Sequence, residues 1–149
     1  MSRLEEVGEI DGWRCWLCDE PVDRTMSVND PRGPSVDSVV TKAKTKGKNG
    51  AAPQERLAHR ACNTKKGAIA PVVKWPEHLF VVDPAPIIAS VDRLQRKSGR
   101  EVMARCPSLA DAEEAARWLV DRISRLQPGL DTTTEIERGG GQFLLILRA

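Results

Sequence analysis

Four potential metal ligands stand in two separated pairs and constrain how this chain can fold. Cys15 and Cys18 form a C-x-x-C pair, and His59 and Cys62 form an H-x-x-C pair much later in the chain. Three thiolates and one imidazole make a closed tetrahedral site for Zn²⁺. Because four protein ligands leave no open position, we predict a structural zinc ion that clamps the first pair to the second. Cys106 stands apart and is interpreted as a small buried residue whose replacement by serine should be nearly neutral.

The N-terminal residues favour metal binding over disulfide formation. The opening stretch MSRLEEVGEIDGW is charged and has no apolar segment typical of a signal peptide. No apolar run approaches the roughly 18 residues that a membrane span needs. We therefore expect a cytoplasmic protein without membrane contact, in which C-x-x-C binds metal. A thiol-redox role for Cys15 and Cys18 is the alternative, but it needs a βαβ context that the flanking residues do not supply.

Positive charge is concentrated in one segment. The whole chain carries 23 Lys and Arg against 21 Asp and Glu, for a net charge of +2. Residues 41–66 hold a single acid, Glu55, among eight bases. Such a local excess predicts contact with nucleic acid, and a merely solvated loop is the alternative. The bases are Lys42, Lys44, Lys46, Lys48, Arg56, Arg60, Lys65 and Lys66.

Hydrophobic patterning predicts an α+β chain with two domains, residues 1–70 and 71–149. In the first, we expect strands at 35–41 and 54–59 and a helix that starts near Arg60. In the second, we expect a strand at 79–82, a helix that Asp83 caps and that ends before Gly99, and a strand at 100–106. A strand pair competes with that helix. Ser108 is expected to cap a long helix, and residues 132–137 and 143–147 are expected to form a final hairpin.

The order of these motifs resembles the HNH endonuclease family. The chain has C-x-x-C, then VDSVV at residues 36–40, then a loop, then LAHRACNTKKG at residues 57–67. The resemblance covers residues 13–68, a little under half of the chain. It implies the zinc-containing ββα-metal fold, also called the His-Me finger, and metal-dependent hydrolysis of DNA phosphodiester bonds.

The resemblance also implies roles for single residues. Asp37 and Asn63 would bind a catalytic Mg²⁺ or Mn²⁺ ion, and Lys66 would contact phosphate. The structural zinc ligands would be Cys15, Cys18, His59 and Cys62. The position of the general-base histidine is occupied by Ser38. Further departures from the family pattern are Gln54 and Thr41, which replace an asparagine and a proline.

Ser38 weakens the expectation of catalysis. Serine is a poor base near neutral pH, whereas imidazole titrates in the useful range, and loss of a general base costs about 10²–10⁴ in rate. His59 is assigned to zinc, and His78, the other histidine, lies in the second domain. We therefore expect an HNH-type DNA endonuclease that is inactive or weakened. The alternative is a non-catalytic zinc module that binds nucleic acid or protein.

The expected partner is double-stranded DNA, and the second domain could support a homodimer or a larger assembly. Residues 143–147, FLLIL, are the strongest apolar run near the C-terminus. They are interpreted either as an exposed contact edge or, with a slight preference, as a buried final strand.

Overall fold

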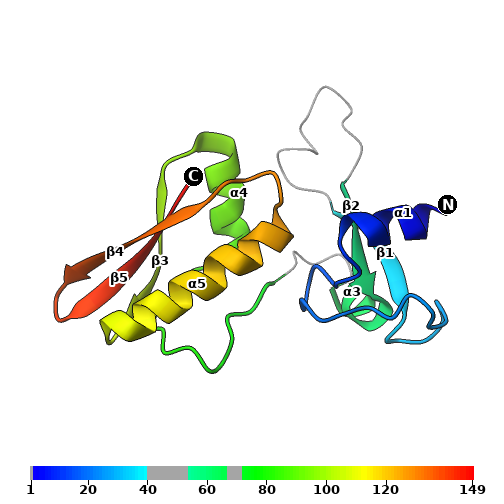
Figure 1. Cartoon of the computed structure of the whole chain (residues 1–149), viewed down its shortest axis with the longest axis horizontal. Helices are drawn as coiled ribbons and strands as arrows, with labels where there is room; N and C mark the ends of the chain where they lie inside the picture. The colour runs from blue at the N-terminus through cyan, green and yellow to red at the C-terminus, as the bar shows by residue number, and fades with distance from the viewer. Residues whose placement is uncertain (1, 40–53, 67–71) are drawn as a thin grey trace. The chain divides into compact units, whose positions relative to one another are not determined.

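The computed structural model describes residues 2–39, 54–66 and 72–149. The chain is a mixed α/β protein, and within the described residues it has four helices and two antiparallel sheets. It divides into two compact units, Met1–Ala70 and Pro71–Ala149. Figure 1 shows their elements, and each unit is described by itself.

The first unit is built on a two-stranded hairpin. Helix α1 spans Arg3–Ile10, strand β1 spans Pro34–Val39, strand β2 spans Gln54–His59, and helix α3 spans Arg60–Lys66. Strands β1 and β2 are antiparallel, and both helices contact both strands. The return strand has the predicted bounds. Strand β1 begins one residue earlier than predicted, and the predicted residues 40–41 lie outside the described part of the chain.

Helix α1 was not predicted from the sequence. It begins with a capping box in which the Ser2 hydroxyl accepts from the Glu5 amide and the Glu5 carboxylate accepts from the Ser2 amide. Val7 and Gly8 are its buried residues. A Cβ atom on Gly8 would lie 2.5 Å from the Trp13 ring, so only glycine lets the helix and the indole approach this closely.

The second unit packs helices against a three-stranded sheet. Helix α4 spans Ile87–Lys97, strand β3 spans Arg100–Cys106, helix α5 spans Leu109–Leu126, and strands β4 and β5 span Thr133–Gly139 and Gln142–Arg148. The strand order is β3-β5-β4, and all pairs are antiparallel. Helix α5 contacts all three strands and α4 contacts β3, as Figure 1 shows. The predicted final hairpin is confirmed.

Strand β5 lies in the middle of this sheet, which decides between the two interpretations of the C-terminal apolar run. Leu145, Ile146 and Leu147 each have 0% exposed surface. The exposed contact edge is therefore wrong, and the buried strand is confirmed. A central strand makes ladder hydrogen bonds on both sides and offers no free edge for another chain.

Two predictions near the start of the second unit are wrong. Residues 79–82 form no strand, and only Val82 makes an isolated bridge with Arg105. The backbone next contacts β3 at Ala85, whose amide donates to the Met103 carbonyl at 2.7 Å. Asp83, with a φ of +50°, and Pro84, which has no N–H to donate, lie between these two contacts and prevent a continuous ladder. Helix α4 begins at Ile87 without a side-chain cap, and the Asp83 carboxylate forms an ion pair with Arg105 instead.

Candidate metal centre

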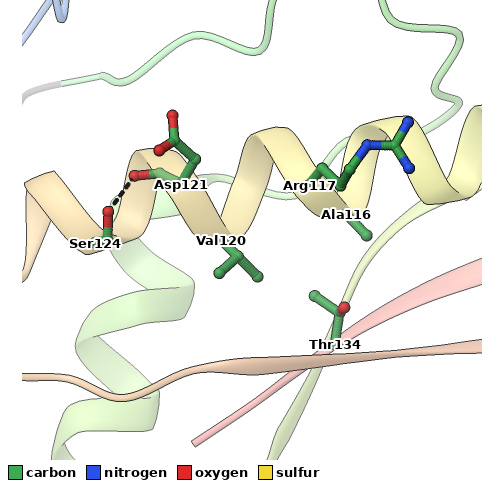
Figure 2. Close-up of a pocket in the computed structure, with 6 residues that line it drawn as sticks. All are labelled: Ala116, Arg117, Val120, Asp121, Ser124 and Thr134. Atoms are coloured by element: carbon green, nitrogen blue, oxygen red, sulfur yellow. Dashed lines mark hydrogen bonds between the residues drawn. The ribbon is translucent and has the colours of Figure 1, made fainter.

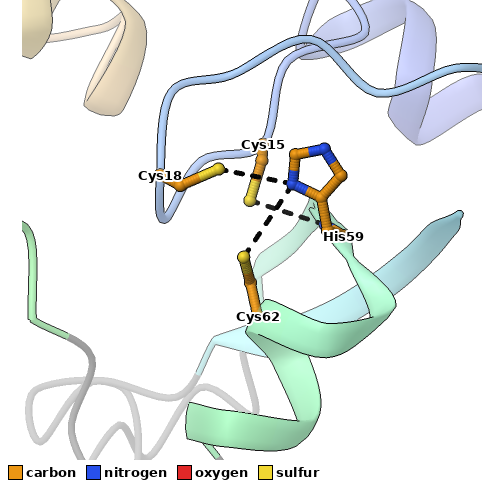
Figure 3. A group of neighbouring side chains, drawn as sticks. All are labelled: Cys15, Cys18, His59 and Cys62. Carbon is orange, nitrogen blue, oxygen red and sulfur yellow. Dashed lines mark hydrogen bonds between the residues drawn. The ribbon is translucent and has the colours of Figure 1, made fainter. Parts of the chain in front are cut away.

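The four predicted zinc ligands come together from three parts of the first unit. Cys15 and Cys18 lie in the loop after α1, His59 is the last residue of β2, and Cys62 lies in the first turn of α3. Their ligand atoms all lie within 4.8 Å of one another. Figure 3 shows the four side chains grouped around a common point. The cluster could hold a metal ion such as zinc.

The distances match a tetrahedral site. The Nδ1 atom of His59 lies 3.3 Å from the Cys18 sulfur and 3.8 Å from the Cys62 sulfur. Zinc bonds of about 2.3 Å to sulfur and about 2.0–2.1 Å to nitrogen give a tetrahedral S···N edge of about 3.5 Å. A zinc ion therefore fits among these atoms with only small movements of the side chains.

The imidazole of His59 is oriented for metal binding by its second nitrogen. Nε2 lies 2.9 Å from the carbonyl oxygen of Pro21. A carbonyl oxygen can only accept, so Nε2 carries the proton and the Nδ1 lone pair points at the three sulfurs. This is the usual outer hydrogen bond of a metal-binding histidine, which fixes the tautomer and the direction of the ring.

The C-x-x-C loop is held in shape by the backbone. The Asp19 amide donates to the Cys15 carbonyl at 2.8 Å, and the Cys15 amide donates to the Glu20 carbonyl at 2.9 Å. Asp19 has a φ of +66°, the left-handed conformation that Asp tolerates better than most residues. The Trp16 amide donates to the Leu57 carbonyl at 2.9 Å, which joins this loop to β2. Backbone hydrogen bonds therefore hold the loop against the hairpin.

The thiols of Cys18 and Cys62 resist ionisation when no cation accompanies them. Burial, together with the charges of Cys15 and Cys18, raises the pKa of Cys62 to about 12. Burial is also the main reason that the pKa of Cys18 is raised. A divalent cation reverses this preference, because a coordinating thiol gives up its proton outright. The arrangement is thus costly as free thiolates and favourable as a metal centre.

Asp37, the predicted ligand of a catalytic cation, is buried with 3% of its surface exposed. Its Oδ2 atom accepts from the Trp16 indole N–H at 3.0 Å. Its Oδ1 atom accepts from the Lys66 ammonium group at 2.8 Å. Lys66, which the resemblance assigned to phosphate, thus forms an ion pair within the unit. The sequence analysis did not foresee either partner of Asp37.

Ser38 lies on the other face of β1 from Asp37. Successive side chains of a strand point to opposite faces, and Ser38 is exposed whereas Asp37 is buried. The residue paired with Ser38 across the hairpin is Glu55, whose carboxylate accepts from Arg3 at 2.8 Å. The structure therefore does not bring Asp37 and the predicted base position together. Strand register places the carboxylate of Glu55 beside Ser38. This neighbour was not predicted from the sequence, because it depends on how the two strands pair.

The remaining predicted site residues lie on or near α3. The side-chain amide of Asn63 donates from Nδ2 to the Ser35 hydroxyl at 3.3 Å and to the Val36 carbonyl at 3.4 Å. These contacts join α3 to β1. Arg60 donates to the Val28 carbonyl at 3.1 Å. Lys65 is exposed in the last turn of the helix. The predicted contacts Lys42, Lys44, Lys46 and Lys48 lie outside the described residues.

A second buried ion pair supports the hairpin beside Asp37. Arg56, which pairs with Asp37 across the strands, donates from Nε to the Asp11 carboxylate at 3.0 Å. The side chains of Arg56 and Asp11 are 6% and 5% exposed. The guanidinium also lies over the Trp16 ring, 5.5 Å from its centroid. No spacing or motif marks this pair in the sequence, because its members are brought together only by the fold.

The second unit has a shallow depression of about 510 Å³ beside α5. Figure 2 shows that its lining comes mainly from one side of that helix. The Ser124 hydroxyl donates to the Asp121 carbonyl at 2.6 Å, so it serves the helix backbone. The lining residues are Ala116, Arg117, Val120, Asp121, Ser124 and Thr134. We assign no chemistry to this depression.

Searches against protein-family models, curated proteins and solved structures find no match to this chain. Among the helices of the described residues, none combines the length and the apolar character required to span a membrane. The metal cluster and the buried ion pairs are therefore the features from which a function can be argued.

Proposed function

We propose that the first unit is an HNH-type module of the ββα-metal class that binds double-stranded DNA and does not hydrolyse it at an appreciable rate. The observation that carries the proposal is the cluster of three cysteines and one histidine, which joins the C-x-x-C loop to the end of β2 and the start of α3. The order of β1, β2 and α3 around that cluster is the order that the resemblance implies.

Charge supports DNA as the partner. Helix α3 has the sequence RACNTKK and contains no acid. Lys66 is paired with Asp37, so Arg60 and Lys65 are the bases that this helix can offer to phosphate. The segment that precedes β2 adds Lys42, Lys44, Lys46 and Lys48. Bases that contact phosphates release counterions and give affinity without sequence preference. We expect weak sequence preference and a strong dependence on salt.

The contacts of Asp37 and Ser38 argue against hydrolysis. General-base catalysis requires a base within hydrogen-bond reach of the attacking water, close to the phosphate that the cation holds. Ser38 supplies no such base, and Asp37 lies on the buried face of β1 with its oxygens directed to Trp16 and Lys66. These features favour binding over cleavage.

The binding proposal is tested by fluorescence anisotropy with a labelled duplex and the zinc-loaded protein. Changing Lys42, Lys44, Lys46 and Lys48 together to Ala should weaken binding to all sequences. The slope of log K against log salt should become shallower by about 0.9 for every phosphate that the variant no longer neutralises. A control that removes the same charge changes four exposed bases of the second unit to Ala and should leave both quantities unchanged; these bases are Lys74, Lys97, Arg117 and Arg138. Equal losses in the two variants would show that the affinity reflects total charge alone.

The expectation that the protein does not cleave DNA is tested separately with supercoiled plasmid and Mg²⁺ or Mn²⁺. The unchanged protein should leave the plasmid intact. Metal-dependent nicking that Asp37→Ala abolishes would refute the binding-only proposal. It would instead support a DNA endonuclease in which Asp37 and Asn63 hold the catalytic cation. Nicking that survives Asp37→Ala would indicate a contaminating nuclease.

A further inference from the structure

We propose that the ammonium group of Lys66 takes the place of a divalent cation beside Asp37, so that this chain carries a built-in cation and binds neither Mg²⁺ nor Mn²⁺ there. The inference deepens the proposed function and rests on it for the expectation that a cation would lie at Asp37. It accounts for binding without cleavage by a second route that is independent of Ser38.

The contacts of Asp37 leave little room for a metal ion. Lys66 Nζ lies 2.8 Å from Oδ1, and the Trp16 indole nitrogen lies 3.0 Å from Oδ2. The Asp37 and Lys66 side chains are 4% and 12% exposed. Mg²⁺ needs near-octahedral oxygen ligands at about 2.0–2.1 Å and keeps several waters. A cation on Oδ1 would therefore have to displace the ammonium group or approach it against strong repulsion.

The charges around this carboxylate already balance. Arg56 lies directly across the hairpin from Asp37 and forms a buried ion pair with Asp11. Among the described residues, these two ion pairs match two carboxylates, Asp11 and Asp37, with two cations, Arg56 and Lys66. Buried charges are stable only when they are paired, and a divalent ion added to this neutral set would leave uncompensated positive charge.

The same ion pair fixes the position of α3. Cys62 joins the first turn of the helix to the metal cluster, and Lys66 joins its last turn to β1. Lys66 therefore acts as a positioning residue as well as a counterion. Removing its charge frees Asp37 for a metal ion and loosens one end of the helix.

The test measures Mn²⁺ binding by electron paramagnetic resonance on zinc-loaded protein without DNA. The unchanged protein should show no site that depends on Asp37, so that it and Asp37→Asn behave alike. Lys66→Gln removes the charge and should create a Mn²⁺ site at least about tenfold tighter than any in the unchanged protein. The double variant Lys66→Gln/Asp37→Asn should lose that site. Lys65→Gln changes the exposed neighbouring lysine and is the matched control, which should gain no Mn²⁺ site.

Thermal unfolding gives a second readout that a merely structural role of Lys66 would not produce. The melting temperature of Lys66→Gln should fall and then recover when MnCl₂ is added, whereas the unchanged protein and Lys65→Gln should not respond. A folded Lys66→Gln that gains no Mn²⁺ site would overturn the inference.

The unchanged protein is informative even if Lys66→Gln does not fold. Mn²⁺ binding by the unchanged protein that Asp37→Asn abolishes would overturn the inference, and equal behaviour of these two proteins would support it. Because no DNA is present, failure of this inference is distinct from failure of the binding proposal, which would appear in the anisotropy experiment alone.

Discussion

Replacing Asp11 with Ala should remove most of the stability of the first unit. Asp11 follows α1, and its carboxylate accepts from Arg56 Nε at 3.0 Å and from the Leu57 amide at 2.6 Å. Leu57 is fully buried and the Arg56 side chain is 6% exposed. The substitution therefore leaves a buried guanidinium without this counterion and a buried N–H without this acceptor.

The size of the effect follows from these contacts. Breaking a buried ion pair by removing one partner costs about 3–5 kcal/mol, and an unsatisfied buried donor costs about 1–3 kcal/mol. The two penalties share one carboxylate and are not additive, so we expect a loss of about 3–5 kcal/mol. A unit of roughly 70 residues has a total stability of about 4–10 kcal/mol. The variant should be close to unfolding at room temperature.

Urea titration of the zinc-loaded protein, followed by the tryptophan indole N–H signals in NMR spectra, reports the two units separately. Trp13 and Trp16 lie in the first unit, and Trp75 and Trp118 lie in the second. The urea midpoint reported by Trp13 and Trp16 should fall sharply. The midpoint reported by Trp75 and Trp118 should stay unchanged. Glu9→Ala, which removes an exposed partner of Arg24, is the control and should shift the first midpoint far less.

If Asp11→Ala lowers the free energy of unfolding of the first unit by less than about 1 kcal/mol, the reasoning is refuted, because breaking a buried ion pair costs more than that. The double variant Asp11→Ala/Arg56→Met provides a second check. It also removes the buried guanidinium that has lost the Asp11 counterion, and it should be more stable than Asp11→Ala alone. If the double variant is instead the less stable of the two, Arg56 stabilises the hairpin mainly through its contact with Trp16.

Five further substitutions, each at a single position, are predicted to have distinct effects. Cys62→Ser should lower the zinc content from about one ion per chain and destabilise the first unit, whereas Cys106→Ser should retain the zinc in elemental analysis. Cys106 is fully buried, as predicted, and the hydroxyl of a serine there would lie away from water, so we now expect its replacement to cost the second unit about 1–3 kcal/mol. Leu145→Ala should cost that unit about 2–5 kcal/mol in calorimetry, since the side chain is 0% exposed. Ser108→Ala removes the acceptor of the Asp111 amide, and it should destabilise α5 by about 1 kcal/mol and speed amide exchange in its first turn. Ser38→His should not produce plasmid nicking, because the imidazole would lie on the exposed face of β1, and nicking would show that the strand can present both groups to one phosphate.

Local patterns predicted the elements that depend on local chemistry. Ser108 begins α5 as expected, because a serine side chain accepts from an amide in the first helical turn. The strand at Gln54–His59 and the helix from Arg60 were also predicted. The predicted strand at 79–82 was wrong, because only Val82 pairs with β3, and Asp83 and Pro84 separate that bridge from the next backbone contact, at Ala85.

The residues of the candidate metal centre can be identified from the order of residues alone. Cysteine and histidine spacings restrict the chemistry to soft ligands, and the fold brings the four ligand atoms within 4.8 Å of one another. The state of Asp37, in contrast, depends on how the chain folds. Strand register places Arg56 opposite it, strand alternation turns it away from Ser38, and the packing of α3 brings Lys66 to 2.8 Å. A buried carboxylate pairs with the cation that the fold places beside it. The position of that cation is set by tertiary structure and cannot be read from the sequence.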